Sequence, residues 1–104
     1  LLHRVMDVIE VAIFTFDPND RLRFINRAGR QLFSQSEEEL LGQSAAELGL
    51  EECIVSTGDR TMELRFPSAT GRWGVSTTIF REEGLQHRLL AVQDLTRALR
   101  EEEI

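Results

Sequence analysis

Apolar residues at the start of the chain recur at the spacing of one helical face. Leu2, Val5, Met6 and Ile9 stand at i, i+3, i+4 and i+7, and polar side chains lie between them. This pattern predicts an amphipathic helix over residues 1–10. Such a helix either packs on the domain as a lid or is shared with a partner chain, and the pattern does not choose between the two.

The next segment changes to the composition of a β-hairpin. Residues 12–16 are mostly aromatic or apolar, residues 17–20 read Asp-Pro-Asn-Asp, and residues 21–25 are again apolar at alternate positions. Proline and Asx residues favour a tight turn. We therefore predict two strands joined by this turn, with Leu22 and Phe24 on one face of the second strand.

Capping residues divide the middle of the chain into short helices. Asn26 is a favourable N-cap, and Ser36 and Ser44 each precede a glutamate at the third helical position, which is the pattern of a capping box. Alternating stretches at 61–66, 72–80 and 85–94 then predict three more strands. From residue 96 onward the pattern is helical again. The order predicts an α+β fold: a five-stranded antiparallel sheet with short helices on one face and helices at both ends.

Composition and charge narrow the function classes. The chain has 104 residues, a length typical of one domain, and 18 acidic against 12 basic residues give a net charge of −6. This balance argues against a nucleic-acid partner, and no apolar run is long enough to insert into a membrane. The single cysteine, Cys53, fits a reducing compartment. It lies far in sequence from His3 and His87, so the sequence predicts no metal site.

Three stretches, in this order, resemble the PAS family. Residues 16–28 resemble the opening hairpin and its Asn-capped helix, residues 36–44 resemble the Glu-Glu-Leu-Leu-Gly helix, and Asp94-Leu95-Thr96 resembles the signature that ends the last strand. The tail 94–103 resembles the segment that joins a PAS domain to the phosphoacceptor helices of bacterial sensor histidine kinases, especially of the nitrogen-regulation class. The resemblance implies a PAS core over 11–95 between the 1–10 helix and the start of a signalling helix at 96–104.

The resemblance also implies a function and partners. It implies a non-catalytic module in the cytoplasm, with the cytoplasmic part of a membrane-bound kinase as one form of this. The module would form a homodimer through Leu2, Val5, Met6 and Ile9, and would act on kinase domains of the same chain. Asp94 and Thr96 would relay a conformational change to the exit helix, with Arg72 as the basic partner of Asp94. The simpler interpretation is that Asp94 or Thr96 only caps the helix.

PAS domains often hold a small molecule between the sheet and the helices, and this gives the alternative function of a ligand receptor. The residues expected to line such a pocket are Leu32, Phe33, Leu41, Leu48, Ile54, Trp73 and Val92. The same residues would equally fill a core. Because the stretch between Leu50 and Arg60 is short, we expect a filled or very small cavity and no cofactor. Neither histidine lies on that stretch for haem, and Cys53 lacks the flavin-binding motif of light-sensing relatives.

Overall fold

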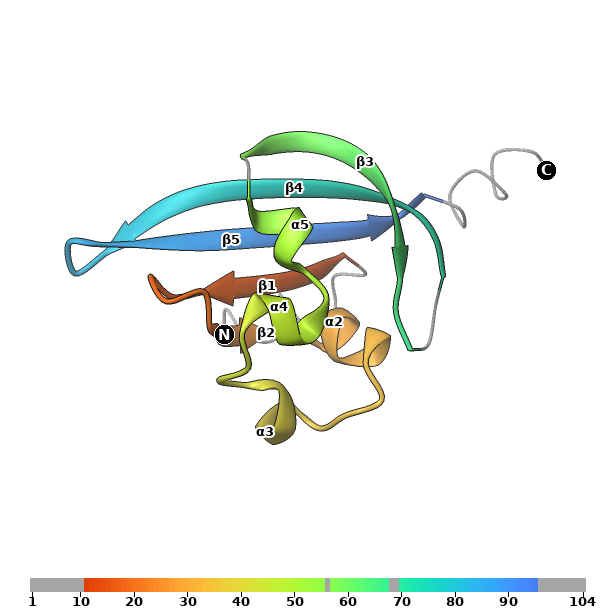
Figure 1. Ribbon diagram of the computed structural model, residues 1–104, viewed down its shortest axis with the longest axis horizontal. Coiled ribbons are helices and arrows are strands. Elements are labelled where there is room, and N and C mark those ends of the chain that lie inside the picture. Colours follow the sequence, from red (N-terminus) through yellow and green to blue (C-terminus); the bar gives the residue numbers. More distant parts are fainter. Residues whose placement is uncertain (1–10, 56, 68–69, 96–104) are drawn as a thin grey trace.

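The computed structural model describes residues 11–55, 57–67 and 70–95, and these form one antiparallel sheet with four short helices on one side (Figure 1). The strands lie in the order β2-β1-β5-β4-β3. This confirms the predicted α+β architecture, and the flanking helices predicted at 1–10 and 96–104 lie outside the described residues. The elements are β1 (Ala12–Phe16), β2 (Leu22–Ile25), α2 (Arg27–Leu32), α3 (Glu37–Leu40), α4 (Ala45–Leu48), α5 (Glu51–Ile54), β3 (Gly58–Arg65), β4 (Thr70–Glu82) and β5 (Leu85–Asp94).

The first hairpin forms where the sequence predicts it, but one face of β2 differs. Phe14 pairs with Ile25 and Phe16 pairs with Leu22, and the register shifts between these two pairs. The shift leaves Arg23 as an extra residue, a β-bulge, which reverses the alternation of side chains. Leu22 and Ile25 are therefore both buried, whereas Phe24 pairs with Thr15 on the opposite face. The prediction that Leu22 and Phe24 share a face is wrong for this reason.

Side-chain caps start three of the helices. The Asn26 side chain accepts a hydrogen bond from Gly29 N, and Ser36 accepts one from Glu39 N. Ser44 forms a complete capping box with Glu47, as predicted. These bonds satisfy amide groups that a helix leaves unpaired at its start. They allow helices of only four to six residues to hold a fixed place under the sheet.

The core lies between the helices and the face of the sheet turned toward them, which we call the inner face. Trp73, Val75 and Thr77 of β4 point inward and are buried, as their alternation predicts. Ile79 belongs to the same series but is exposed, since it lies past Thr77, where the pairing of β4 with β3 ends, and level with Phe16, the last residue of β1. The β4–β5 hairpin then continues beyond the end of β1 (Figure 1). The opposite face of the sheet, which we call the outer face, carries the residues between these positions.

Candidate signal-relay site

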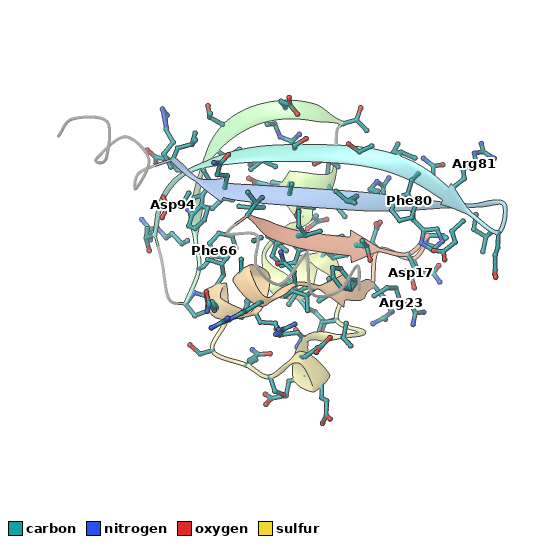
Figure 2. The ribbon with its side chains drawn as sticks, turned by 180° about the vertical axis from the view of Figure 1, so that it is seen from behind. Asp17, Arg23, Phe66, Phe80, Arg81 and Asp94 are labelled. Carbon is teal, nitrogen blue, oxygen red and sulfur yellow. The ribbon has the colours of Figure 1, made fainter. Side chains whose placement is uncertain are left out.

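The end of β5 brings together most of the residues predicted to act in the relay. Asp94 pairs in register with Trp73 of β4, and Arg72 is the preceding residue of β4. Leu95 lies over Gly74 on the outer face, where a methyl group built on Gly74 would be 3.6 Å from Leu95 Cδ2. Figure 2 shows Asp94 at the end of the sheet opposite to Phe80. An ion pair between Arg72 and Asp94 stays a prediction.

Other predicted site residues lie outside the described part of the chain. Thr96, the second oxygen donor of the relay signature, follows the last described residue. The predicted dimer helix also lies outside the described residues, with its four apolar positions Leu2, Val5, Met6 and Ile9. Their roles stay predictions.

Six of the seven predicted pocket residues belong to one buried cluster: Leu32, Phe33, Leu48, Ile54, Trp73 and Val92. Leu41 does not, since its residue surface is 37% exposed. Leu41 is the C-cap of α3 with extended backbone angles, and Leu40 takes the fully buried position instead. A capping residue leaves the helical path, so its side chain does not continue the buried face of the helix.

Aromatic rings pack against one another among the residues predicted either to line a pocket or to fill the core. Phe14 meets Phe33 edge to face with ring centroids 6.2 Å apart, Phe33 meets Phe66 at 5.6 Å, and Phe66 meets Trp73 at 5.0 Å. Edge-to-face contacts at these distances are favourable. Trp73 Nε1 is buried without a hydrogen-bond partner among the described residues. Packing against neighbouring rings therefore holds the indole in place, and the ring series runs from Phe14 of β1 to Trp73 of β4.

Hydrogen bonds at the end of α5 tie this helix to the sheet. The Thr77 hydroxyl donates to the Cys53 carbonyl oxygen at 2.6 Å, and the Arg60 guanidinium donates to the Cys53 and Glu52 carbonyl oxygens. These carbonyl groups have no partner within so short a helix. The Cys53 side chain itself is fully buried, and burial raises the pKa of its thiol above the usual value. A neutral, enclosed thiol is a packing group and not a reactive one.

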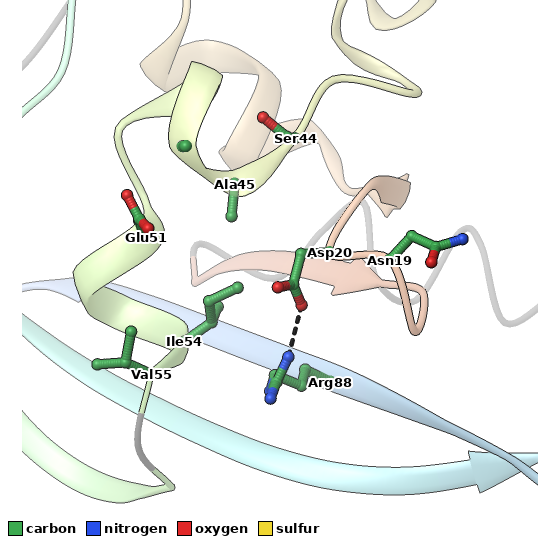
Figure 3. Close-up of a pocket in the computed structure, with 9 residues that line it drawn as sticks. Asn19, Asp20, Ser44, Ala45, Glu51, Ile54, Val55 and Arg88 are labelled. Atoms are coloured by element: carbon green, nitrogen blue, oxygen red, sulfur yellow. Dashed lines mark hydrogen bonds and ion pairs between the residues drawn. The ribbon is translucent and has the colours of Figure 1, made fainter.

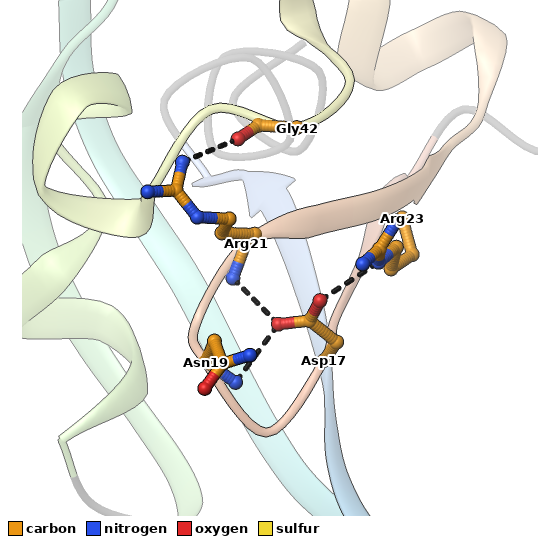
Figure 4. Close-up of polar contacts among 5 residues, drawn as sticks. All are labelled: Asp17, Asn19, Arg21, Arg23 and Gly42. Carbon is orange, nitrogen blue, oxygen red and sulfur yellow. Dashed lines mark hydrogen bonds and ion pairs between the residues drawn. The ribbon is translucent and has the colours of Figure 1, made fainter.

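The turn between β1 and β2 carries a polar network that the sequence analysis did not identify (Figure 4). Asp17 Oδ1 accepts from Asn19 N at 2.9 Å and from Arg21 N at 3.0 Å, and Asp17 Oδ2 accepts from Arg23 Nε at 2.8 Å. Arg21 Nη1 in turn donates to the Gly42 carbonyl oxygen at 2.8 Å. Burial alone would raise the pKa of Asp17, but these donors outweigh it and hold that pKa below its usual value. The network fixes the turn against the segment that precedes α4.

A groove runs along the outer face of the sheet beside Asp94. It has a volume of about 600 Å³ and includes small residues in its floor: Gly74, Ser76 and Ala91. The other lining residues, two of them charged, are Val11, Asp59, Arg60, Thr61, Val75, Gln93 and Leu95. Small side chains on three adjacent strand positions leave room for bulkier side chains from another segment. The groove therefore lies on the same end of β5 as the relay residues.

The described residues also limit other kinds of site. Among residues 11–55, 57–67 and 70–95, no three His, Cys, Asp or Glu side chains gather in a way that could hold a metal ion. Within the same ranges, no helix has the length and apolar character needed to cross a membrane. Phe80 and His87 stack at 5.3 Å on the hairpin, so the described histidine packs on an aromatic ring.

The fold of the described chain is similar to the folds of PAS domains in solved structures. The PAS domain of nitrogen regulation protein NR(II) from Vibrio parahaemolyticus matches with a TM-score of 0.70 and 18% identity, over 90% of this chain and 97% of that one. The PAS domain of Bordetella pertussis BvgS matches with a TM-score of 0.76 and 15% identity, over 95% and 86%. A PAS domain from a two-component sensor histidine kinase matches with a TM-score of 0.67 and 14% identity, over 88% and 91%. These likenesses show a shared fold.

Sequence comparison points to the same family. No curated protein sequence matches the chain significantly. A family model described as the PAS fold matches residues 6–64, which is more than half of the chain. The matched region includes the first hairpin and all four described helices, and so it covers two of the three stretches that carried the sequence resemblance; Asp94-Leu95-Thr96 lies outside it. The chain therefore belongs to the PAS fold family of sensory domains.

Proposed function

We propose that this PAS domain is a signal-relay and dimerisation module of a cytoplasmic sensor histidine kinase of the nitrogen-regulation class, and that it has no catalytic activity of its own. The observation that carries the proposal is the position of β5. This strand pairs with β1 on one side and β4 on the other, and it ends at Asp94. A change in the twist of the sheet would therefore reach the residues that follow the strand.

Asp94 and Leu95 couple the end of β5 to β4 on both faces of the sheet. By register, Asp94 lies opposite the buried Trp73 on the inner face, whereas Leu95 contacts Gly74 on the outer face. In the proposed relay, Thr96 begins the exit helix and Arg72 stabilises the Asp94 carboxylate. A shift of β4 would alter both contacts at once and so bias the direction of the helix. Two discrete states of this junction would supply the switch.

The outer-face groove supports the dimerisation part of the proposal. An amphipathic helix needs an apolar surface for Leu2, Val5, Met6 and Ile9, and the groove floor of Gly74, Ser76 and Ala91 offers space for such side chains. We place the 1–10 helix against this face, with its remaining apolar surface shared with the same helix of a second copy. Because Leu95 lines the same groove, a dimer formed through the 1–10 helices would bring the exit helices of the two copies together.

A receptor with a ligand in the core is the alternative function. The buried cluster of Phe33, Phe66 and Trp73 occupies the region that such a ligand would need. A ligand there would have to displace packed rings, and those rings would lose the edge-to-face contacts that they make with one another. The relay function requires no such displacement, and we prefer it for this reason.

The proposed relay is tested by replacing Asp94 in the sensor histidine kinase that, by this proposal, contains the domain. We expect Asp94→Ala to change the autophosphorylation rate at least about fivefold and to abolish its response to signal, while the thermal melting of the domain shifts by only a few degrees. Glu82→Ala is the matched control, because Glu82 is an exposed carboxylate at the opposite end of β4. Unchanged autophosphorylation in Asp94→Ala would contradict the relay.

Native mass spectrometry of the 104-residue chain tests dimerisation and the alternative together. We expect a dimer without added mass, and we expect Met6→Glu to convert it to a monomer because a charge cannot be buried in an apolar helix interface. Added mass that is lost on denaturation would instead favour the receptor. A monomer at all concentrations would contradict dimerisation through residues 1–10.

A further inference from the structure

A second cleft lies on the helix side of the molecule (Figure 3). Its β5 residue, Arg88, lies in the half of the strand away from Asp94. It has a volume of about 450 Å³ and lies between the β1–β2 turn, α4, α5 and β5. This volume is in the range of small-molecule sites. Its lining is polar around the turn and at the start of α5, and apolar at the end of α5. The polar residues are Asn19, Asp20, Ser44, Glu51 and Arg88.

Arg88 is an unusual residue for its position in β5. It pairs with Phe16 and Ile79, and so it belongs to the inner series of the strand, followed by the buried Leu90 and Val92. A charged side chain on this face needs partners. Arg88 Nη1 donates to Asp20 Oδ1 at 2.5 Å, and Asp20 is the one hydrogen-bond partner of this guanidinium among the described residues. The Nε and Nη2 donors remain available to a carboxylate in the cleft, the group that arginine binds through two parallel bonds.

Two carboxylates line the same cleft. Asp20 uses one oxygen for Arg88 and keeps the other, and the exposed Glu51 stands at the first position of α5. The cleft therefore offers one guanidinium and two carboxylates, with the Asn19 amide and the Ser44 hydroxyl beside them. A simple anion would be repelled by the carboxylates, and a simple cation would be repelled by Arg88. A ligand that carries both charges matches both sets of groups.

The remaining wall of the cleft is aliphatic. Ala45 and Ala46 of α4, with Ile54 and Val55 at the end of α5, line this side. Val55 is 70% exposed, the largest fraction among the large hydrophobic residues of the described part. We propose that the cleft binds a small aliphatic α-amino acid, with its carboxylate on Arg88, its ammonium group on Glu51 and Asp20, and its side chain on Ile54 and Val55.

This site differs from a cavity in the core: it shares only Ile54 with the residues predicted to line the core pocket, and its other lining residues lie around the turn, α4, α5 and β5. It also gives the proposed relay an input, and that second step rests on the proposed function. Arg88 and Asp94 lie on the same face of β5, separated by the buried Leu90 and Val92. A carboxylate that draws Arg88 away from Asp20 would act on the strand that ends at Asp94.

Titration of the 104-residue chain with L-leucine, followed by amide NMR shifts, tests the binding. We expect saturable shifts at residues 19–20, 44–46, 51–55 and 88, with Kd below about 1 mM. Isocaproate lacks the ammonium group and isopentylamine lacks the carboxylate. Each should bind at least about tenfold more weakly than leucine, because each leaves charged groups of the cleft unmatched. Equal binding of either analogue, or shifts located elsewhere, would overturn the proposal.

Substitutions separate the two charged contacts from general effects on folding. Arg88→Gln and Glu51→Gln should each weaken leucine binding at least about tenfold, and Val55→Ser should weaken it about threefold to tenfold. Arg23→Gln is the matched control, since Arg23 also pairs with an aspartate of the same turn but does not line this cleft. Glu51 and Val55 are exposed, so their variants should keep the melting temperature of the parent chain.

The outcomes distinguish this proposal from the relay. If leucine binds but Asp94→Ala leaves kinase output unchanged, the amino-acid site stands and the relay fails. If leucine causes no shift at about 20 mM, well above the expected Kd, the site is overturned whatever the kinase result. If Glu51→Gln and Arg88→Gln bind leucine as the parent chain does, the assigned contacts are wrong and the proposal fails.

Discussion

The Thr77 hydroxyl donates a hydrogen bond to the Cys53 carbonyl oxygen, at 2.6 Å, and so links a central strand of the sheet to the last turn of α5. Both residues are buried. The bond joins positions 24 residues apart in the sequence and holds α5 next to β4. Because α5 has only four residues, its position depends on such contacts more than on its own helical stability.

Thr77→Val should lower the free energy of unfolding by about 1–2 kcal/mol. Valine keeps the shape of threonine but removes the donor, and the Cys53 carbonyl oxygen retains Arg60 as its other partner. Urea denaturation measures the change. Thr78→Val is the matched control, because Thr78 is the exposed neighbour on the same strand and its substitution should change stability by less than about 0.5 kcal/mol. Equal stability of the Thr77 variant and the parent chain would show that the bond contributes nothing.

Asn26→Ala should destabilise the chain by about 3 kcal/mol or more. The buried Asn26 side chain accepts from Ile13 N and Gly29 N, each at 2.9 Å, and donates to the Val11 carbonyl oxygen at 2.8 Å. Alanine leaves three backbone groups without this partner, and each buried unpaired group costs about 1 kcal/mol or more. Thermal melting measures the loss. Asn19→Ala, at an exposed position of the first turn, is the control, and a similar small effect of both variants would contradict the argument.

Local features of this fold were predictable from the sequence because they depend on neighbouring residues. The Asn26 and Ser44 caps and the Asp17–Asp20 turn each satisfy backbone groups within four residues, so their side-chain chemistry indicates them directly. The inward positions of Trp73, Val75 and Thr77 follow from strict alternation. In these places the periodicity of the sequence and the packing of the domain agree.

Features that depend on partner strands were not predictable in this way. The bulge at Arg23 became visible only through the register of β1, and it reversed the expected face of Phe24. Likewise, Arg88 faces the helices because of its pairing with Phe16, a relationship between residues 72 positions apart. The candidate amino-acid site was missed for this reason, although an arginine beside the apolar run 89–92 was a signal of it.

Gly29→Ala and Gly74→Ala should have opposite effects on stability. In an open helix interior, replacement of glycine by alanine stabilises by about 0.5–1 kcal/mol. At Gly29, however, the new methyl group would lie 2.7 Å from Ile25 Cγ1 and 3.3 Å from Asn26 Oδ1, and both of these residues are buried. We expect a loss of about 1–3 kcal/mol there. At Gly74 the nearest atom is Leu95 Cδ2 at 3.6 Å, so alanine should be neutral or stabilising.

Chemical denaturation of both glycine variants gives the comparison. A stabilised Gly29→Ala chain would mean that Ile25 moves aside without cost, and a strongly destabilised Gly74→Ala chain would mean that Leu95 is packed more tightly than its distance indicates. The pair thus tests the packing at the first helix and at the relay end of the sheet in one experiment.

Asp17 should make stability dependent on pH in acid. Its pKa in the folded chain lies below the usual value, so its contribution is present above the pKa of the unfolded state and is lost as pH falls through the folded value. Asp17→Asn should therefore cost about 1–3 kcal/mol at neutral pH and less at about pH 2, because the parent carboxyl group takes up a proton as pH falls through its folded pKa. Urea midpoints at both pH values measure this difference, with Glu38→Gln as an exposed control. If Asp17→Asn lowered the free energy of unfolding equally at both pH values, the loss would come from the changed side-chain group and not from the charge of the Asp17 carboxylate.

Cys53 should react with iodoacetamide only when the chain unfolds. Its side chain is fully buried, and burial raises the pKa of its thiol, while the nearby Arg60 opposes this shift only in part. The folded chain therefore holds the thiol proton more firmly than the unfolded chain. Its contribution to stability is present below the unfolded pKa, near 8.5 for a free cysteine, and is lost as pH rises through the folded value.

Alkylation at about pH 8 should be at least about a hundredfold faster in denaturing urea than in buffer. Thr57→Cys adds a thiol at an exposed position nearby, and mass spectrometry should find one rapid and one slow modification in that variant. Rapid modification of Cys53 in the folded parent chain would mean that α5 separates from β4 readily, and that the Thr77 bond does not hold it.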